Sequence, residues 1–324
     1  MTTSSHLDYL KNEFNNTSLD HEKLKSHIHL YKSTFKAAAP SIINKIKKRN
    51  PRTQRAIFIL DQYAYKDVPF ETIRHIFQTL TNSEVILTFN YDTAQAYISD
   101  HANNRKAFEN INLDKYIAWD RLAQFKEQNC WHSAIQEQLS SAIYQASGAK
   151  HMTLFFIHPK KGQSYWLVHL SKVYKARDVM MDLHWKHANY DPLNQHFSHH
   201  LHTGLFALGY KALETPKQNS FNFTEEKILD QNTEQRCIDN LSVELSRLIC
   251  DSHTTITFGE LTDQLGSFSV ASEQHFKKAL QGPLQNKELI ISTHEGGVRR
   301  SAAQINYSDL IKYNQHPLIF LAEK

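Results

Sequence analysis

Glycine is missing from the first 147 residues of this 324-residue chain, and the first glycine is Gly148. A Rossmann-type cofactor site needs a glycine-rich turn after its first strand, because glycine alone lets the backbone approach the ligand closely. No residue before Gly148 can supply that turn. The sequence therefore argues against a complete cofactor loop of this kind in its N-terminal part.

Cysteines and long apolar runs are also scarce. The three cysteines, Cys130, Cys237 and Cys250, are odd in number and far apart, which fits a reducing cytosol better than a disulfide framework. None forms a CxxC pair, so no cysteine-based zinc site is expected. No apolar run approaches the roughly 20 residues of a membrane span, and the N-terminus has no signal-peptide core. We expect a cytoplasmic protein.

The bulk composition is that of an ordinary globular protein. Hydrophobic residues make up 40% and charged residues 22%, and the length favours two domains. The formal net charge is +4, and the 20 histidines add positive charge only in acid. Such a balance permits nucleic-acid contact but does not require it.

The stretch QRAIFILDQYAY, residues 54–65, is the best candidate for the centre of the fold. Its short apolar run predicts a strand buried on both faces, as in a parallel α/β sheet, ending at Asp61. The carboxyl ends of such strands line the ligand crevice, so Asp61, Tyr63 and Tyr65 are candidate catalytic or binding residues. The alternative is that Asp61 caps the next turn and the tyrosines pack.

The surrounding pattern alternates between helices and strands, which predicts parallel βα units. Helical insertions, forming a cap, are expected over residues 93–147. The helix at 176–188 should bury an apolar stripe of Val179, Met180, Leu183 and Trp185. The other expected elements are helices at 6–14, 35–50 and 69–80, strands at 26–31 and 85–89, and a hairpin of strands 152–158 and 165–170.

The C-terminal part follows a different order, after a linker at 216–224. The order of its elements predicts a winged helix-turn-helix domain. These elements are a helix at 233–250, a short strand, a helix, a helix at 272–286, the strand ELIIST, a Gly296-Gly297 turn and the strand SAAQIN. We place the domains at 1–221 and 222–324. The candidate nucleic-acid contacts are the cations Lys277, Lys278, Arg299 and Arg300, although nearby acids make protein docking about equally plausible.

Two further clusters have simpler interpretations. The histidines lack a recognised spacing such as HExxH, so we expect a polar surface cluster and no metal site. Lys172, Lys175 and Arg177 would be a solvated basic helix start, with phosphate contact as the alternative. The histidines are His184, His187, His196, His199, His200 and His202.

Several segments together resemble the three-Cys-motif partner protein family, TcmP. They are FILDQYAYKDVPFETIRHIF, VILTFNYD, SYWLVHLSKVYKARDVMMDLHW, LFALGY and GGVRRSAAQI, and the similarity runs over nearly the whole chain. The resemblance implies an S-adenosylmethionine-dependent methyltransferase-like fold with a C-terminal winged domain. It also implies a phage-related partner protein that carries a three-cysteine motif.

Two departures from the family shape the functional hypothesis. The strand and glycine-rich loop resembling DxFAGPG, which would bind S-adenosylmethionine, have no counterpart, so the sheet should be incomplete Rossmann-like and leave apolar surface needing a cover. The resemblance would place the start of this chain near the helix that follows the family's second strand. The DPFGY-like motif reads Asp61-Gln62-Tyr63-Ala64-Tyr65, where Asp61 and Tyr63 would hold a target amine.

The leading hypothesis is therefore a TcmP-like protein, methyltransferase-like, that acts with a partner in a phage or mobile-element context. Whether the chain is itself an enzyme stays open. The alternative, from another functional class, is a non-enzymatic nucleic-acid-binding or adaptor protein that uses its winged helix.

Overall fold

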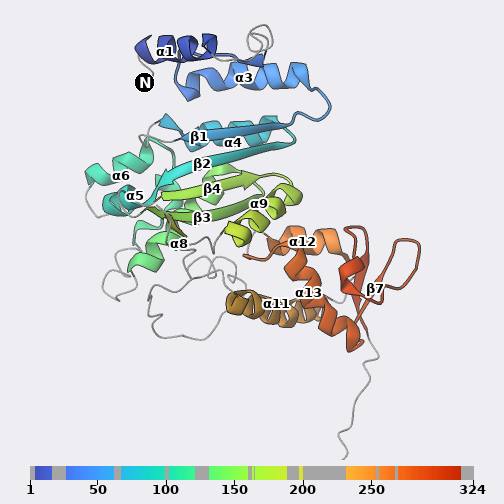
Figure 1. The fold of residues 1–324 in the computed structure, drawn as a ribbon. Coiled ribbons are helices and arrows are strands. Elements are labelled where there is room, and N and C mark those ends of the chain that lie inside the picture. The colour runs from blue at the N-terminus through green and yellow to red at the C-terminus, as the bar shows by residue number, and fades with distance from the viewer. Residues whose placement is uncertain are drawn as a thin grey trace, which may run out of the picture.

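A five-stranded mixed sheet organises the N-terminal part of the chain in the computed structural model (Figure 1). The structure describes residues 4–16, 27–61, 67–98, 102–120, 131–159, 163, 165–187, 197–199, 231–252, 255–266 and 269–314. We call residues 4–199 the sheet lobe and residues 231–314 the C-terminal lobe. The sheet strands are β1 (Ala56–Asp61), β2 (Ser83–Asn90), β3 (His151–Pro159), β4 (Tyr165–Ser171) and β5 (Phe197–His199).

The strand order is β1-β2-β4-β3-β5. β1 and β2 are parallel, as the sequence predicted, because helix α4 connects them. The other pairs are antiparallel, and β3 and β4 form the expected hairpin. The sheet is therefore mixed, and the parallel arrangement stops after its first pair.

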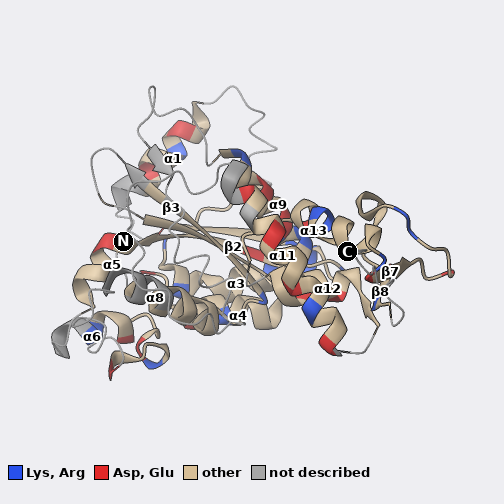
Figure 2. Cartoon of the chain, turned by 90° about the horizontal axis from the view of Figure 1, so that it is seen from below, with Lys and Arg blue, Asp and Glu red and all other residues tan. Residues whose placement is uncertain are grey.

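Helices cover the sheet on both faces (Figure 2). α3, α4 and α8 lie on one face, where Ile43, Ile73 and Ile143 share a core with strand residues such as Leu87. α9 packs on the opposite face, against β3 and β4. The helices and short 3-10 turns of this lobe are α1 (Ser4–Asn15), α3 (Phe35–Arg49), α4 (Phe70–Thr79), α5 (Tyr91–Tyr97), α6 (Ala102–Glu109), η2 (Asp114–Tyr116), α8 (Trp131–Ser147) and α9 (Tyr174–His187).

β1 is an edge strand, and only one of its faces is buried. Phe58 and Leu60 point into the core, whereas Ile57 and Ile59 are 64% and 77% exposed. The prediction of a strand buried on both faces was wrong, because strand residues alternate between faces and none of the described helices covers the second face over β1. The expectation of an apolar sheet surface lacking a cover does agree with these two isoleucines.

Two other local predictions were also wrong. The described part of the strand expected at 26–31 contains no strand, because residue 27 is helical and residues 28–31 are irregular. In α9, Val179 and Leu183 of the expected apolar stripe are exposed. The buried face of α9 instead carries mainly polar groups, and its buried residues are Tyr174, Arg177, Asp178 and His184 together with the apolar Met181.

The C-terminal lobe combines three helices with a small antiparallel sheet of order β6-β8-β7. The predicted strand SAAQIN contains the 3-10 turn η4 instead, and the last strand begins nine residues after the first residue of that segment, at Leu310. The elements are α11 (Gln231–Ser252), β6 (Ile256–Thr257), α12 (Phe258–Gly266), α13 (Glu273–Gln285), β7 (Leu289–Ser292), η4 (Ala302–Gln304) and β8 (Leu310–Tyr313).

The two lobes share an apolar core. Phe155 of β3 and Met181 of α9 belong to the same buried cluster as Cys237 and Leu241 of α11. The domain boundary expected near residue 222 lies outside the described residues. Among the helices that the structure describes, none is long and apolar enough to cross a membrane.

A close contact between the lobes depends on Gly266, the last residue of α12. A Cβ atom at this position would lie 2.9 Å from Cδ2 of Tyr174 and closer still to Cε2. Tyr174 is itself buried at the start of α9, so its ring has little room to move. Glycine at this position lets the two lobes approach closely.

Replacing Gly266 by alanine should lower the free energy of unfolding by about 1–3 kcal/mol, through overpacking against Tyr174. Urea denaturation followed by circular dichroism measures the change. Gly282→Ala is the matched control, because no atom lies within 4 Å of its added Cβ and α13 should gain about 0.5–1 kcal/mol. Equal effects at the two positions would contradict the packing argument.

Candidate functional site

Asp61 lies where the sequence predicted, at the carboxyl end of β1. Its side chain is exposed, and Thr88 Oγ1 of the neighbouring β2 donates a hydrogen bond of 2.5 Å to Asp61 Oδ1. The two residues are direct partners in the parallel register. Tyr63 and Tyr65 lie outside the described residues. The carboxylate is thus held at a sheet end, open to solvent.

Two residues near this sheet end were not expected from the sequence. Tyr165 begins β4, and its pKa is raised first by burial and then by the charge of Asp61. Asn90 ends β2, caps α5 by accepting from Thr93 N–H at 3.0 Å, and donates to Gln163 Oε1 at 2.5 Å. Their positions at strand ends are visible in the sequence, but the register that brings them near Asp61 is not.

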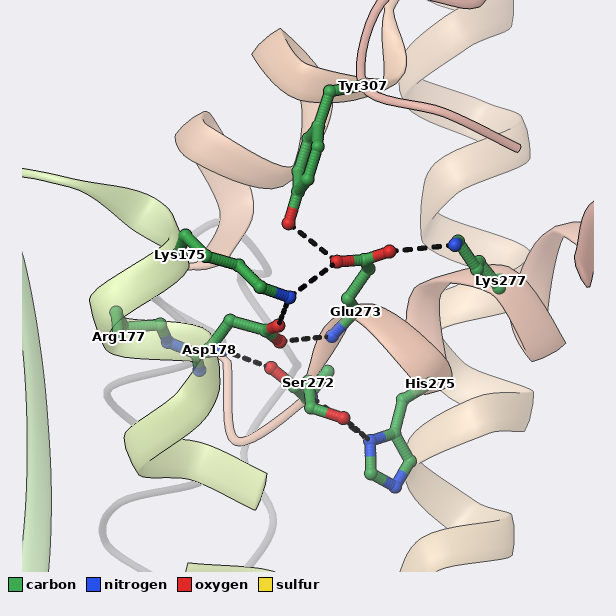
Figure 3. Close-up of polar contacts among 9 residues, drawn as sticks. Lys175, Arg177, Asp178, Ser272, Glu273, His275, Lys277 and Tyr307 are labelled. Carbon is green, nitrogen blue, oxygen red and sulfur yellow. Dashed lines mark hydrogen bonds and ion pairs between the residues drawn. The ribbon is translucent and has the colours of Figure 1, made fainter. Parts of the chain in front are cut away.

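The densest polar cluster joins the two lobes (Figure 3). It grows from the buried face of α9, where Arg177 is fully buried. Arg177 donates to the backbone carbonyls of Ser269 and Ala271, in the segment that leads into α13. The prediction of a solvated basic helix start was therefore wrong for Arg177, because contacts with a segment about 90 residues away bury it.

Asp178, beside Arg177, caps α13 from the other lobe. Its Oδ1 accepts the backbone N–H of Glu273 at 2.6 Å, and its Oδ2 accepts from Lys175 Nζ at 2.9 Å. A carboxylate at a helix N-terminus satisfies an otherwise unpaired N–H and complements the helix dipole. Ser272 and His275 complete this end with a capping box.

Glu273 is the hub of the cluster. Its carboxylate receives hydrogen bonds from Lys277 Nζ at 2.7 Å, Lys175 Nζ at 3.2 Å and the Tyr307 hydroxyl at 2.6 Å. Figure 3 shows these donors converging on one side chain from α9, α13 and the segment before β8. Three donors around one carboxylate favour its charged form strongly.

The electrostatics of the cluster follow from these bonds. Burial alone would raise the pKa of Glu273, but the bonds from Lys277, Tyr307 and Lys175 outweigh it and lower the pKa to about 2. The hydrogen bond to Asp178 raises the pKa of Lys175 above its usual value. Burial lowers the pKa of His275 to about 4, so its ring is neutral at pH 7.

These pKa directions decide what the cluster can do. A general acid or base works best with a pKa near the operating pH, whereas Glu273 and His275 are shifted well below neutrality and Lys175 is shifted upward. Each of the three is also hydrogen-bonded within the protein. The arrangement is suited to fastening the lobes together rather than to proton transfer.

Three of the four cations proposed for nucleic-acid contact are paired within the chain. Lys277 contacts Glu273, Lys278 contacts Glu234 at 2.5 Å, and Arg299 binds the buried carboxylate of Asp309 at 2.8 Å. Arg300 is exposed and makes no ion pair among the described residues. The basic face that the sequence indicated on α13 is therefore largely neutralised by acids.

The histidine cluster divides between described and undescribed parts of the chain. His184 is buried with its ring 4.8 Å from that of Phe155, and His187 is exposed at the end of α9. Of the remaining members, only the backbone of His199 is described. Within the residues that the structure covers, no group of three or more His, Cys, Asp or Glu side chains could hold a metal ion.

Comparison with known proteins gives no relative for this chain: no protein-family model, curated protein or solved structure matches it. Functional inference therefore depends on the residues and geometry described above.

The cluster around Glu273 predicts a definite pH dependence of stability. Because the folded pKa of about 2 lies below the ordinary 4.5, the stabilisation is present above about pH 4.5 and is lost as the pH falls toward 2. Glu273→Gln should lower the free energy of unfolding by about 2 kcal/mol at pH 6, and the difference from the wild type should shrink below pH 4.5.

Chemical denaturation at several pH values measures this difference. Glu71→Gln is the matched control, since Glu71 also lies in the first turn of a helix, α4, but is exposed and in no ion pair among the described residues. A Glu273→Gln effect that stays constant from pH 6 to pH 3 would show that the ion pairs do not stabilise the fold.

Proposed function

We propose that this chain is a TcmP-like protein: a methyltransferase-like sheet without its cofactor-binding part, followed by a winged-helix module, acting with a partner protein in a phage or mobile-element setting in the cytoplasm. The proposal depends mainly on one observation: β1 is an edge strand, and on one of its faces the side chains of Ile57 and Ile59 are exposed to solvent. The family assignment depends on the sequence resemblance. The exposed apolar side chains of β1 are the physical reason to expect a partner.

The sheet topology supports the incomplete Rossmann-like interpretation. Doubly wound sheets often carry antiparallel strands at one edge of an otherwise parallel sheet. Here β4 and β3 fill that role beside the parallel pair β1 and β2. Further parallel strands would add on the free side of β1, next to the strand end that carries Asp61.

The cofactor fits poorly with the residues around Asp61. A methyl donor such as S-adenosylmethionine would need backbone that approaches it closely, as glycine-rich turns do. No glycine occurs before Gly148, and the described residues next to Asp61 are the side chains of Thr88 and Tyr165. We therefore derive no methyl-transfer step from this chain alone, and assign Asp61, Tyr63 and Tyr65 to holding a substrate group.

The C-terminal lobe supports the winged-helix part of the proposal. Its order of helix, strand, two helices, strand, turn and strand, with sheet order β6-β8-β7, is that expected for the module. This observation also favours the second candidate function, a nucleic-acid-binding or adaptor protein. Failure of the purified chain to bind duplex or single-stranded DNA at low salt would remove the nucleic-acid form of that candidate.

Isothermal titration calorimetry with S-adenosylmethionine tests the proposal that this chain alone does not form a complete cofactor-binding site. We expect no measurable binding heat for the chain alone, because no glycine occurs before Gly148 and no strand lies beyond β1 in the described part of the sheet. Saturable binding in the micromolar range would overturn this part of the proposal, and Asp61→Asn would then show whether Asp61 contributes to the site.

The partner proposal predicts a specific effect of Ile59→Lys. In coexpression with a three-cysteine-motif protein encoded beside it, the wild-type chain should copurify with that protein and Ile59→Lys should not. The lysine should leave the melting temperature unchanged, since Ile59 is 77% exposed and charges on edge strands block pairing.

Val243→Lys is the matched control, because Val243 is 70% exposed but lies on α11 in the C-terminal lobe. It should leave copurification intact. Analytical ultracentrifugation of the chain alone tests the competing explanation, in which a second copy of this chain binds to β1. If the wild type is a dimer that Ile59→Lys converts to a monomer, a second copy of the chain covers β1 instead of a different protein.

A further inference from the structure

The segment from Lys45 to Arg55 has an unusual charge density. Six of its eleven residues are cations and none is acidic. These six charges exceed the net charge of +4 of the whole chain, so the remainder of the chain is net negative. We call this segment the basic segment. Its cations are Lys45, Lys47, Lys48, Arg49, Arg52 and Arg55.

All six cations are exposed, and none forms an ion pair among the described residues. Lys45 Nζ lies over the ring of Tyr31, 5.4 Å from the ring centroid. Several cations elsewhere bond within the protein: Lys172, for example, donates to the carbonyls of Phe77 and Leu80. The basic segment can therefore bind an external anion without breaking an ion pair within the described residues.

The backbone that carries the last two arginines is held in place. Asn82 Nδ2 donates to Thr53 O at 2.8 Å, and Thr81 N–H donates to the side-chain oxygen of Gln54 at 3.2 Å. Gln54 N–H closes the turn onto Asn50 O at 2.9 Å. Arg52 and Arg55 are thus presented on a turn that is fastened to the loop between α4 and β2.

A purely local explanation accounts for only half of these charges. Cations in the last turn of a helix complement its negative dipole end, and Lys47, Lys48 and Arg49 lie in the last turn of α3. Arg52 and Arg55 lie beyond the helix, and Lys45 lies one turn before its end, where the dipole effect fades. The helix dipole therefore does not account for the charges of Lys45, Arg52 and Arg55, which are available for an external anion.

We propose that the basic segment binds the phosphate backbone of nucleic acid. Nucleic acid is a polyanion with about one charge per 1.7 Å of duplex, which suits six closely spaced cations. Arginine, which makes up half of them, matches phosphate geometry with two parallel hydrogen bonds. Figure 1 shows the turn between α3 and β1 at the end of the sheet nearer to the C-terminal lobe. This surface is independent of the methyltransferase-like assignment.

Fluorescence anisotropy with labelled duplex DNA and the matching single strand tests the proposal, at about 50 and about 200 mM salt. The test variant replaces Arg49, Arg52 and Arg55 by alanine. We expect it to bind about tenfold more weakly at low salt, with a slope of log affinity against log salt that is smaller by up to about 3. Replacement of the same arginines by lysine should restore most of the binding.

The matched control removes three cations elsewhere, with Lys36→Ala, Lys106→Ala and Lys312→Ala, all exposed in the structure. It carries the same net charge as the test variant and should bind like the wild type. Arg300→Ala separates the basic segment from the C-terminal lobe and should have a smaller effect. Circular dichroism verifies that each variant is folded.

Three outcomes would overturn the proposal. The wild type binds neither form of DNA at low salt, or the control loses as much affinity as the test variant, or only Arg300→Ala weakens binding. Vesicles containing anionic phospholipid serve as a competing polyanion. Binding to the vesicles without binding to DNA would assign the basic segment to a membrane surface instead.

Discussion

The buried guanidinium of Arg177 is the constraint on which the joined structure depends. A guanidinium cannot lose its proton in a protein, so burial requires compensating acceptors. Arg177 finds them in the carbonyls of Ser269 and Ala271, which belong to the C-terminal lobe. Separating the lobes would remove these acceptors and expose the apolar core that the lobes share to water, so both the hydrogen bonds and the burial favour the joined state. Asp178, which caps α13, adds to the same junction, and the lobes should therefore unfold as one unit.

The sequence predicted the elements whose patterns are strong and local. α3, α13 and the β3–β4 hairpin lie close to their expected bounds, because capping residues, basic helix ends and turn residues mark them directly. α9 was misjudged because apolar spacing assumes an apolar core, whereas its buried face meets the carbonyls and the helix end of a distant segment. The position of Asp61 was predictable, but its contact with Thr88 required the strand register.

The distribution of charge separates structural from available cations. Those that face the junction of the lobes meet acids or carbonyls, and Figure 2 shows blue and red residues mixed where α9, α11 and α13 lie together. Lys277 is an example, since its charge is balanced by Glu273 within one helix. A count of lysines along α13 therefore overstates its attraction for phosphate, because a neighbouring carboxylate cancels much of the field of a lysine at distances longer than the separation of the two charges. The basic segment lacks such partners, and its field extends into solvent.

The two proposed binding surfaces, which are the exposed face of β1 and the basic segment, adjoin each other along the chain. Arg55 immediately precedes β1, and by the two-residue period of a strand it shares a face with Ile57 and Ile59. A protein that covers these isoleucines would therefore also approach Arg55, while leaving the cations of α3 accessible. Partner and nucleic acid would then compete for one arginine, or an acidic partner would neutralise it. Under these two proposals the binding equilibria would be linked, and by thermodynamic reciprocity each ligand would change the affinity for the other by the same factor.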